Sequence, residues 1–210
     1  MTETDIRYAS DIAFTPSVKE IQARKGSRRH YERMETGGSW QTEITEDLIN
    51  FIQSRTTIFL ATANLSGQPY IQHRGGPTGF LKVLDERTIG FADFSGNRQY
   101  VTQGNLADNP KACLFLVDYT YRQRVKLWGE AKVVENDRDL EARLKPEDYN
   151  ARVEQVILFT VNAWDANCPQ HIPRLIDEDV VKQFLSEKDR RISELEEKIA
   201  RLEARLGPIT

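Results

Sequence analysis

The segment Gly90–Tyr100, which reads GFADFSGNRQY, marks a place where a strand gives way to a helix. We expect a strand over Thr88–Asp93, a break at Ser95-Gly96-Asn97, and a helix that begins at Arg98-Gln99-Tyr100 and runs to Leu106. A helix start presents free backbone N–H groups at the positive end of the helix dipole, and Arg98 adds a fork of charged donors. The segment is therefore either an anion-binding corner suited to phosphate or an ordinary turn with a solvated arginine.

Short strands precede and follow this segment. Turn residues separate β-branched and apolar runs at Thr57–Ala63, Pro69–Arg74, Phe80–Leu84, Thr88–Asp93, Lys111–Asp118, Arg124–Val134 and Glu154–Val161. Helices are expected at Thr45–Ser54, after Gly96 and at Asp137–Leu144, so helices and strands do not alternate. The pattern predicts a mainly β (β+α) fold, an antiparallel barrel of six to seven strands with short flanking helices.

Two terminal regions flank the predicted barrel, which spans residues 45–172. Residues 1–44 form an arm in which Pro16 opens a short helix, with Ser17 and Glu20 as a capping box. The arm carries a basic patch, interpreted either as a solvated surface or as a flap that approaches an anion on a partner subunit: Lys19, Arg24, Lys25, Arg28, Arg29 and Arg33.

Residues 177–206 are expected to form one long amphipathic helix. Its apolar residues follow heptad a/d spacing, at Leu185, Ile192, Leu195, Ile199, Leu202 and Leu206. The helix is interpreted either as a coiled coil that assists a dimer or as a helix packed on its own domain.

Composition excludes several classes of protein. The 210 residues are 39% hydrophobic and 29% charged, as in a globular protein, and a net charge of −3 argues against a nucleic-acid binder. The longest apolar runs are too short for a membrane span, the N-terminal sequence lacks signal-peptide features, and two cysteines do not make a disulfide framework. Three scattered histidines predict no metal site. We expect a soluble cytoplasmic protein.

Five blocks occur in an order that resembles a known family. They include RGGPTGFLKVLDERTIGFADFSGNRQY (74–100), NPKACLFL (109–116), YRQRVKLWGEA (121–131) and NCPQHI (167–172). From Thr45 to Ala163 the chain resembles the pyridoxamine 5′-phosphate oxidase-like flavoproteins, in particular their flavin-nucleotide-binding branch. The resemblance implies a split β-barrel and a homodimer with FMN at the subunit interface.

The resemblance also implies which residues hold FMN. Arg74, Lys82, Asn97, Arg98 and Gln99 would bind the ribityl phosphate, a dianion that needs several charged donors. The backbone of Asp93, Phe94 and Ser95 would border the isoalloxazine ring, and Gln123 of the other subunit would reach its edge. Gln72 and Arg124, at polar strand ends, complete the expected cofactor-binding set.

The resemblance favours an FMN-dependent oxidoreductase with a nicotinamide nucleotide as electron donor. The segment NCPQHI replaces the aromatic and arginine residues that clamp the vitamin phosphate, so we expect a substrate other than pyridoxamine phosphate. Cys168 and His171 are candidate catalytic residues, or else loop residues with satisfied hydrogen bonds. Two alternatives remain: a flavin-binding or redox-sensing module without turnover, and a barrel that binds haem or a deazaflavin.

Overall fold

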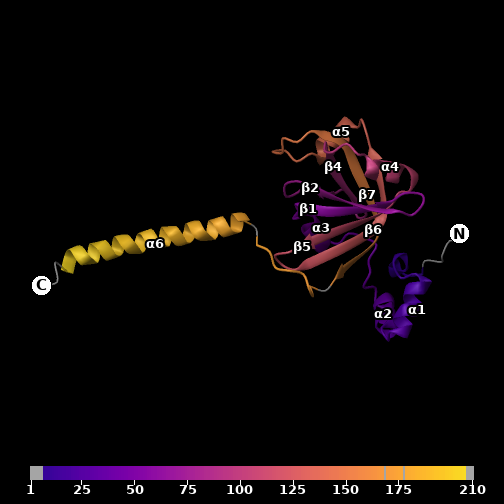
Figure 1. The fold of residues 1–210 in the computed structure, drawn as a ribbon, viewed down its shortest axis with the longest axis horizontal. Helices are drawn as coiled ribbons and strands as arrows, with labels where there is room; N and C mark the ends of the chain where they lie inside the picture. The colour runs from indigo at the N-terminus through magenta and orange to yellow at the C-terminus, as the bar shows by residue number, and fades with distance from the viewer. Residues whose placement is uncertain (1–6, 168, 177, 207–210) are drawn as a thin grey trace. The chain divides into compact units, whose positions relative to one another are not determined.

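Seven strands form one antiparallel sheet in a computed structural model that describes residues 7–167, 169–176 and 178–206 (Figure 1). The strand order is β2-β1-β5-β6-β7-β4-β3. The strands are β1 (Thr57–Ala63), β2 (Pro69–Gly75), β3 (Lys82–Val83), β4 (Thr88–Phe94), β5 (Lys111–Asp118), β6 (Gln123–Val134) and β7 (Val153–Asn167). The antiparallel barrel predicted from the strand pattern is confirmed.

The two ends of the strand order come together without pairing. β2 and β4 are linked by an ion pair between Arg74 and Asp93, but within the described residues no backbone ladder joins these strands. β3 pairs with β4 only through Lys82↔Gly90 and Val83↔Ile89, so the rest of β4 faces β2 across an opening. The barrel is therefore split between β2 and β4.

The described residues also form helices: η1 (Ala9–Ile12), α1 (Pro16–Arg24), α2 (Arg28–Thr36), α3 (Glu46–Gln53), α4 (Val101–Asp108), α5 (Arg138–Leu144) and the long α6 (Glu178–Leu206). The sequence predicts α1, α3, α5 and α6 but not η1 or α2. Thr45 caps α3 by accepting a hydrogen bond from the Leu48 N–H at 3.4 Å. Asp137 caps α5 by accepting one from the Leu140 N–H at 3.0 Å. Side-chain caps of this kind satisfy N–H groups that a helix start leaves unpaired.

The core fills the inside of the barrel because the strand residues alternate between its two faces. β1 shows the alternation directly, with Ile58 and Leu60 fully buried and Phe59 and Ala61 partly exposed. The fully buried large side chains include Phe80, Phe91, Phe159, Ile52, Ile58, Leu60, Leu81, Ile89, Leu114, Leu116, Leu127 and Leu144.

Two strands differ from the prediction by more than one residue at an end. The expected strand Phe80–Leu84 reduces to two residues, because Phe80 and Leu81 turn into the core from the preceding loop instead of pairing with β4. The last strand continues beyond Val161 to Asn167, because β6 supplies pairing partners as far as Arg124↔Asn167.

The N-terminal region is more ordered than an arm. The prediction of a capping box formed by Ser17 and Glu20 is wrong. Thr15 caps α1 instead, because its side chain accepts a hydrogen bond from the Val18 N–H. On α2, the buried Glu35 pairs with Arg28, which also donates to Gln22 Oε1 at 2.6 Å. Part of the basic patch is thus committed to holding the helices together.

The segment after α2 attaches these helices to the barrel. The Trp40 ring stacks on Trp128 of β6 with ring centroids 4.7 Å apart. Gln41 forms a bridge with Trp164 of β7, whose indole N–H donates to the Glu43 carbonyl at 2.7 Å. All of these contacts lie on the side of the sheet formed by β6 and β7.

The C-terminal part of the chain forms a second compact unit. Its described residues from His171 to Leu206 are grouped with Tyr119–Arg122. Within this unit α6 is one continuous helix, as the heptad pattern predicts. Among the described helices, none is both long enough and apolar enough to cross a membrane.

Candidate functional site

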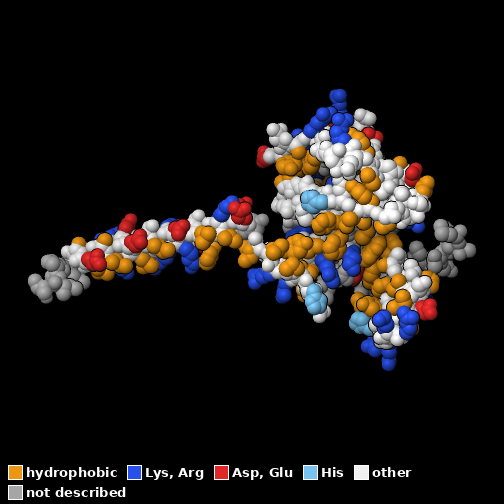
Figure 2. Space-filling view, viewed as in Figure 1, with side chains coloured by type: hydrophobic (Ala, Val, Ile, Leu, Met, Phe, Trp, Pro, Cys, Tyr) orange, Lys and Arg blue, Asp and Glu red, His pale blue; other side chains and the backbone are white. Residues whose placement is uncertain are grey.

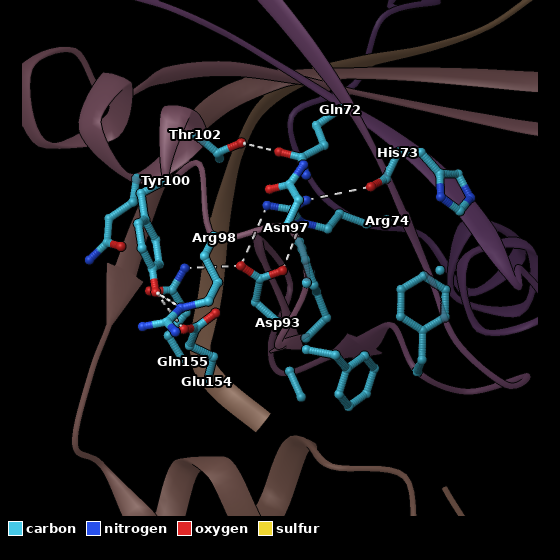
Figure 3. Close-up of a pocket in the computed structure, with 17 residues that line it drawn as sticks. Gln72, His73, Arg74, Asp93, Asn97, Arg98, Tyr100, Thr102, Glu154 and Gln155 are labelled. Carbon is cyan, nitrogen blue, oxygen red and sulfur yellow. Dashed lines mark hydrogen bonds and ion pairs between the residues drawn. The ribbon is translucent and has the colours of Figure 1, made fainter. Parts of the chain in front are cut away.

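A pocket of about 220 Å³ occupies the split in the barrel (Figure 3). β2 contributes residues 72–75, β4 contributes residues 91–94, and β7 contributes Glu154 and Gln155. The loop between β4 and α4, with the first turn of α4, supplies the remaining rim: Gly96, Asn97, Arg98, Tyr100, Thr102 and Gln103. The pocket is thus made where the sheet lacks a strand-to-strand ladder.

A buried ion pair lies inside the pocket. Arg74 Nε lies 2.7 Å from Asp93 Oδ1, and Gln155 Nε2 donates to Asp93 Oδ2 at 2.9 Å. Burial raises the pKa of Asp93, an effect that outweighs the opposing influence of the Arg74 charge and the Gln155 hydrogen bond. Arg74 therefore shares its charge with a carboxyl of its own chain.

The loop after β4 differs from the predicted helix start. Arg98 and Tyr100 adopt left-handed backbone conformations, with φ of 59° and 55°, and α4 begins only at Val101. The backbone N–H of Gln99 donates to Asn97 Oδ1 at 3.1 Å, which closes an Asx turn. The prediction that Arg98 lies in the first turn of the helix is wrong, because this turn precedes the helix.

Arg98 nevertheless reaches the pocket rim. Its Nε donates to the Tyr100 hydroxyl at 3.2 Å, and that hydroxyl donates to Glu154 Oε1 at 2.8 Å (Figure 3). The Arg98 side chain is exposed, and the guanidinium keeps further donors for a ligand. The loop therefore places a fixed positive charge beside the split.

Gln72 adds a polar group from β2. Its Oε1 accepts hydrogen bonds from Thr102 Oγ1 at 3.1 Å and from the Tyr70 hydroxyl at 3.0 Å. Because both bonds use the oxygen, the Nε2 group is the part of Gln72 that can donate to a ligand. Gln72 is thereby fixed in one orientation.

Aromatic rings form the apolar side of the pocket. Phe91 contacts Phe80 with ring centroids 6.3 Å apart, and Phe94 contacts Tyr149 at 5.0 Å, both edge to face. A β-carbon on Gly76 would lie 2.7 Å from the Phe80 Cβ, so glycine is required for this packing. The pocket therefore combines flat apolar walls with polar and cationic groups at its rim.

The structure brings together six of the predicted cofactor-binding residues as pocket lining: Gln72, Arg74, Asp93, Phe94, Asn97 and Arg98. Gln99 lies in the same loop and bonds to Asn97. Ser95 adjoins the pocket, with its N–H donating to the Arg152 carbonyl at 2.9 Å.

Three other predicted residues lie outside the pocket of this chain. The Lys82 ammonium donates to the Arg143 carbonyl at 2.7 Å, on α5. Gln123 and Arg124 begin β6, where they pair with Asp118 and Val117 of β5. Of the two candidate catalytic residues, Cys168 lies outside the described residues, and His171 is exposed in the second unit with φ of 63°.

Sequence reasoning did not single out several residues that line the pocket. Glu154 and Gln155 begin β7, and Tyr100, Thr102 and Gln103 lie around the start of α4. No local motif marks Gln155, because its role depends on β7 pairing with β4 through Asp93↔Gln155. The one local signal was the pair Glu154-Gln155, an acid and an amide that directly precede the apolar run of β7.

A family model described as pyridoxamine 5′-phosphate oxidase matches residues 44–185. No curated protein matches the chain.

Three solved structures from bacteria are among those to which the chain is similar. A putative pyridoxamine 5′-phosphate oxidase from Lactobacillus delbrueckii is 22% identical, with a TM-score of 0.45, covering 59% of this chain and 94% of its own. An FMN-binding protein from Syntrophomonas wolfei is 11% identical, with a TM-score of 0.45, and the match covers 70% of this chain and 97% of that protein. The heme storage protein HutZ from Vibrio cholerae is 16% identical, with a TM-score of 0.39, and the match covers 56% of this chain and 88% of that protein.

The family model spans most of the chain and includes the whole sheet, the split and the loop that carries Arg98. The chain belongs to the pyridoxamine 5′-phosphate oxidase family.

Proposed function

We propose that the chain binds FMN in the split of the barrel, as part of a homodimer, and acts as an FMN-dependent oxidoreductase. The observation that carries the proposal is the pocket itself, which sets Arg98 and Asn97 at its rim and Phe91 and Phe94 along its wall. A flat amphipathic ring needs apolar walls with polar groups at its edge, and a phosphate needs charged donors.

The residues present fit FMN with one adjustment to the predicted roles. Because Arg74 is paired with Asp93, its charge is largely balanced within the chain. Arg98 and Asn97, which are exposed, are better placed to meet a phosphate dianion. In this proposal Arg74 positions the pocket wall, and Arg98 supplies most of the positive charge.

The pocket of one chain is small for the whole cofactor. Its volume of about 220 Å³ lies below the range of about 300–1,000 Å³ that is common for ligand sites. A second copy would complete the site, and Lys82, Gln123 and Arg124 are the residues proposed to reach it from the partner. This arrangement accounts for their positions outside the pocket of their own chain.

One face of the sheet is suited to bind that second copy. The residues that alternate with the core on β2, β1, β5 and β6 form an outer face: Ile71, His73, Phe59, Ala61, Cys113, Phe115 and Lys126. Ile71 is 61% exposed, and Phe59 and Phe115 are partly exposed. Figure 2 shows hydrophobic side chains gathered over the strands that Figure 1 labels β5 and β6. Exposed apolar surface of this kind is typical of an interface.

FMN would supply the redox chemistry, and the protein would bind, orient and shield it. The proposed substrate is not pyridoxamine phosphate, because NCPQHI stands where a phosphate clamp is expected. Cys168 and His171 remain the proposed catalytic residues, and a nicotinamide nucleotide the proposed electron donor.

The first experiment is a visible absorption spectrum of the purified full chain, followed by denaturation and mass measurement of the released chromophore. We expect a flavin spectrum and the mass of FMN at about one molecule per chain, with bleaching on addition of NADH or NADPH and recovery in air. A haem or deazaflavin chromophore would replace FMN in the proposal. A flavin that no nicotinamide nucleotide reduces would reject that electron donor.

A further inference from the structure

The helix α6 exposes a continuous apolar stripe. Its a/d residues remain between 41% and 54% exposed over three heptads: Leu185, Ile192, Leu195, Ile199 and Leu202. A helix with a stripe this narrow buries it against another helix, as in a coiled coil. We propose that α6 pairs with α6 of a second copy of this chain as a parallel, in-register, two-stranded coiled coil.

The identity of the apolar residues favours two parallel strands. With Ile192 placed at position a, Ile199 also occupies a, while Leu195 and Leu202 occupy d, so the two central heptads have isoleucine at a and leucine at d; Leu185 and Leu206 occupy the outer a positions. β-branched residues at a with leucine at d favour the parallel dimer over larger assemblies.

The charged residues beside the stripe determine whether the two helices run parallel or antiparallel more strongly than the apolar residues do. Every g position in this part of α6 is basic, and the e positions that follow are acidic. The g residues are Arg191, Lys198 and Arg205, and the e residues are Glu196 and Glu203.

In a parallel pair, each g residue faces the e residue five positions later on the other helix. Arg191 then faces the partner's Glu196, and Lys198 faces the partner's Glu203, and the same pairs recur on the opposite side of the coil. An antiparallel pair would place g beside g and e beside e, so that like charges meet along both sides. The pattern therefore selects a second, parallel copy of the same helix.

Lys188 is the one polar residue within the stripe over residues 185–202, and it occupies position d. Its Nζ lies 5.0 Å from the centroid of the Phe184 ring, one turn earlier. A single lysine in the stripe lowers the stability of a coiled coil but specifies its register, because any shift would place the lysine against an apolar layer.

Three heptads form only a marginal coiled coil when isolated. The rest of the chain raises the effective concentration of the second helix if the barrels also associate, so the pairing belongs to the full chain. The inference therefore rests on the homodimer of the proposed function, but it uses no residue of the pocket and does not require bound FMN.

Cysteine cross-linking of the full chain tests the orientation. Leu202→Cys is made in a Cys113→Ser, Cys168→Ser background, with Ala204→Cys, on the outer face of the coil, as the matched control. Under mild oxidation we expect a disulfide-linked dimer with Leu202→Cys, and at least tenfold less with Ala204→Cys. Equal cross-linking of the two variants would overturn the proposal. An efficient mixed disulfide between Leu185→Cys and Leu202→Cys chains would also overturn it, because position a faces position d of the other helix only when the two helices are antiparallel.

Charge reversal tests the pairing rule without altering the apolar stripe. We expect Glu196→Lys with Glu203→Lys to reduce the Leu202→Cys cross-link several-fold. A second chain is then made that carries Leu202→Cys together with Arg191→Glu and Lys198→Glu. Mixing the two charge-reversed chains should restore the cross-link, now as a disulfide-linked heterodimer. The control variant Glu187→Lys with Glu197→Lys makes the same change in net charge at outer positions and should cross-link like the parent. Equal loss in both double variants would reject the role assigned to the e and g charges.

Discussion

Arg74 and Asp93 form an ion pair between two strands that share no backbone hydrogen bonds, with Nε 2.7 Å from Oδ1. β2 is the first strand in the sheet order, and β4 is the last but one. Because the barrel is open between them, side chains hold its margins together at the pocket. The same two residues therefore serve both the closure of the barrel and the shape of the site.

The pKa of Asp93 gives this pair a pH dependence. Burial raises that pKa above its ordinary value of 3.8, so the folded state binds the proton more tightly than the unfolded state. Stability from the protonated carboxyl is complete below pH 3.8 and is lost as pH rises through the folded pKa. Between pH 3.8 and the folded pKa of Asp93, we expect the free energy of unfolding to fall less steeply with pH in the Asp93→Asn variant than in the parent. Urea unfolding at several pH values measures this slope.

A control for the Asp93 variant has the opposite sign. The Arg87 N–H donates to Asp85 Oδ1 at 2.9 Å, and this hydrogen bond lowers the pKa of Asp85. Stability from Asp85 is therefore present above pH 3.8 and lost on acidification. Asp85→Asn should remove a rise of stability with pH that lies below pH 3.8 and should leave the slope above pH 3.8 close to that of the parent. Equal slopes above pH 3.8 in the Asp93→Asn and Asp85→Asn variants would contradict the assignment to Asp93.

Arg98→Ala should yield folded protein with little bound flavin. Loss of a charged hydrogen bond to phosphate costs about 1.5–3 kcal/mol, which corresponds to roughly ten- to 150-fold weaker FMN binding. Alanine retains the β-carbon at φ 59°, so the backbone strain of the loop is unchanged. Titration of FMN into stripped protein measures the effect, and Arg98→Lys, which keeps the charge, should lose less affinity. Undiminished occupancy in Arg98→Ala would contradict the assigned phosphate site.

Ile71→Glu should weaken the proposed dimer and its flavin site together. Ile71 is 61% exposed on the outer face, where a carboxylate would be desolvated by a second copy. Leu65→Glu is the control, since Leu65 is 75% exposed in the turn between β1 and β2. Sedimentation measures the mass at several concentrations, and flavin absorbance measures occupancy. Equal behaviour of both variants would argue against this face as the interface.

Gly129→Ala should destabilise the barrel by about 1–3 kcal/mol or more, as overpacking does. The register between β6 and β7 shifts between Trp128 and Gly129, and a β-carbon there would lie 1.9 Å from the Thr160 carbonyl oxygen. Gly104→Ala is the matched control, because its β-carbon meets nothing within 4 Å and α4 is helical there. Urea unfolding should show a gain of about 0.5–1 kcal/mol for Gly104→Ala.

The sequence predicts most of the sheet because the signals for β1 and β5 are local. Both strands have the predicted bounds, Thr57–Ala63 and Lys111–Asp118, because β-branched or apolar runs end at turn residues. The helix capped by Thr45 follows the same logic, since cap and apolar face lie within one short window.

The candidate site was less accessible to prediction because it depends on contacts between distant strands. Asp93 was expected to offer backbone to a flavin, whereas its side chain accepts from Arg74 and Gln155, which come from β2 and β7. The left-handed conformations of Arg98 and Tyr100 carry no glycine signal, since both are side-chain-bearing residues held by the surrounding loop. Spacing along the chain does not encode either feature.

The attachment of the N-terminal helices provides an optical reporter. The chain has three tryptophans, and all three lie where the segment Trp40–Glu43 meets β6 and β7. Detachment of that segment would separate the Trp40 and Trp128 rings and release the Trp164 indole from Glu43. Intrinsic fluorescence therefore follows the docking of this one segment, while visible absorbance follows a chromophore in the split, so the two events can be timed separately in a single sample.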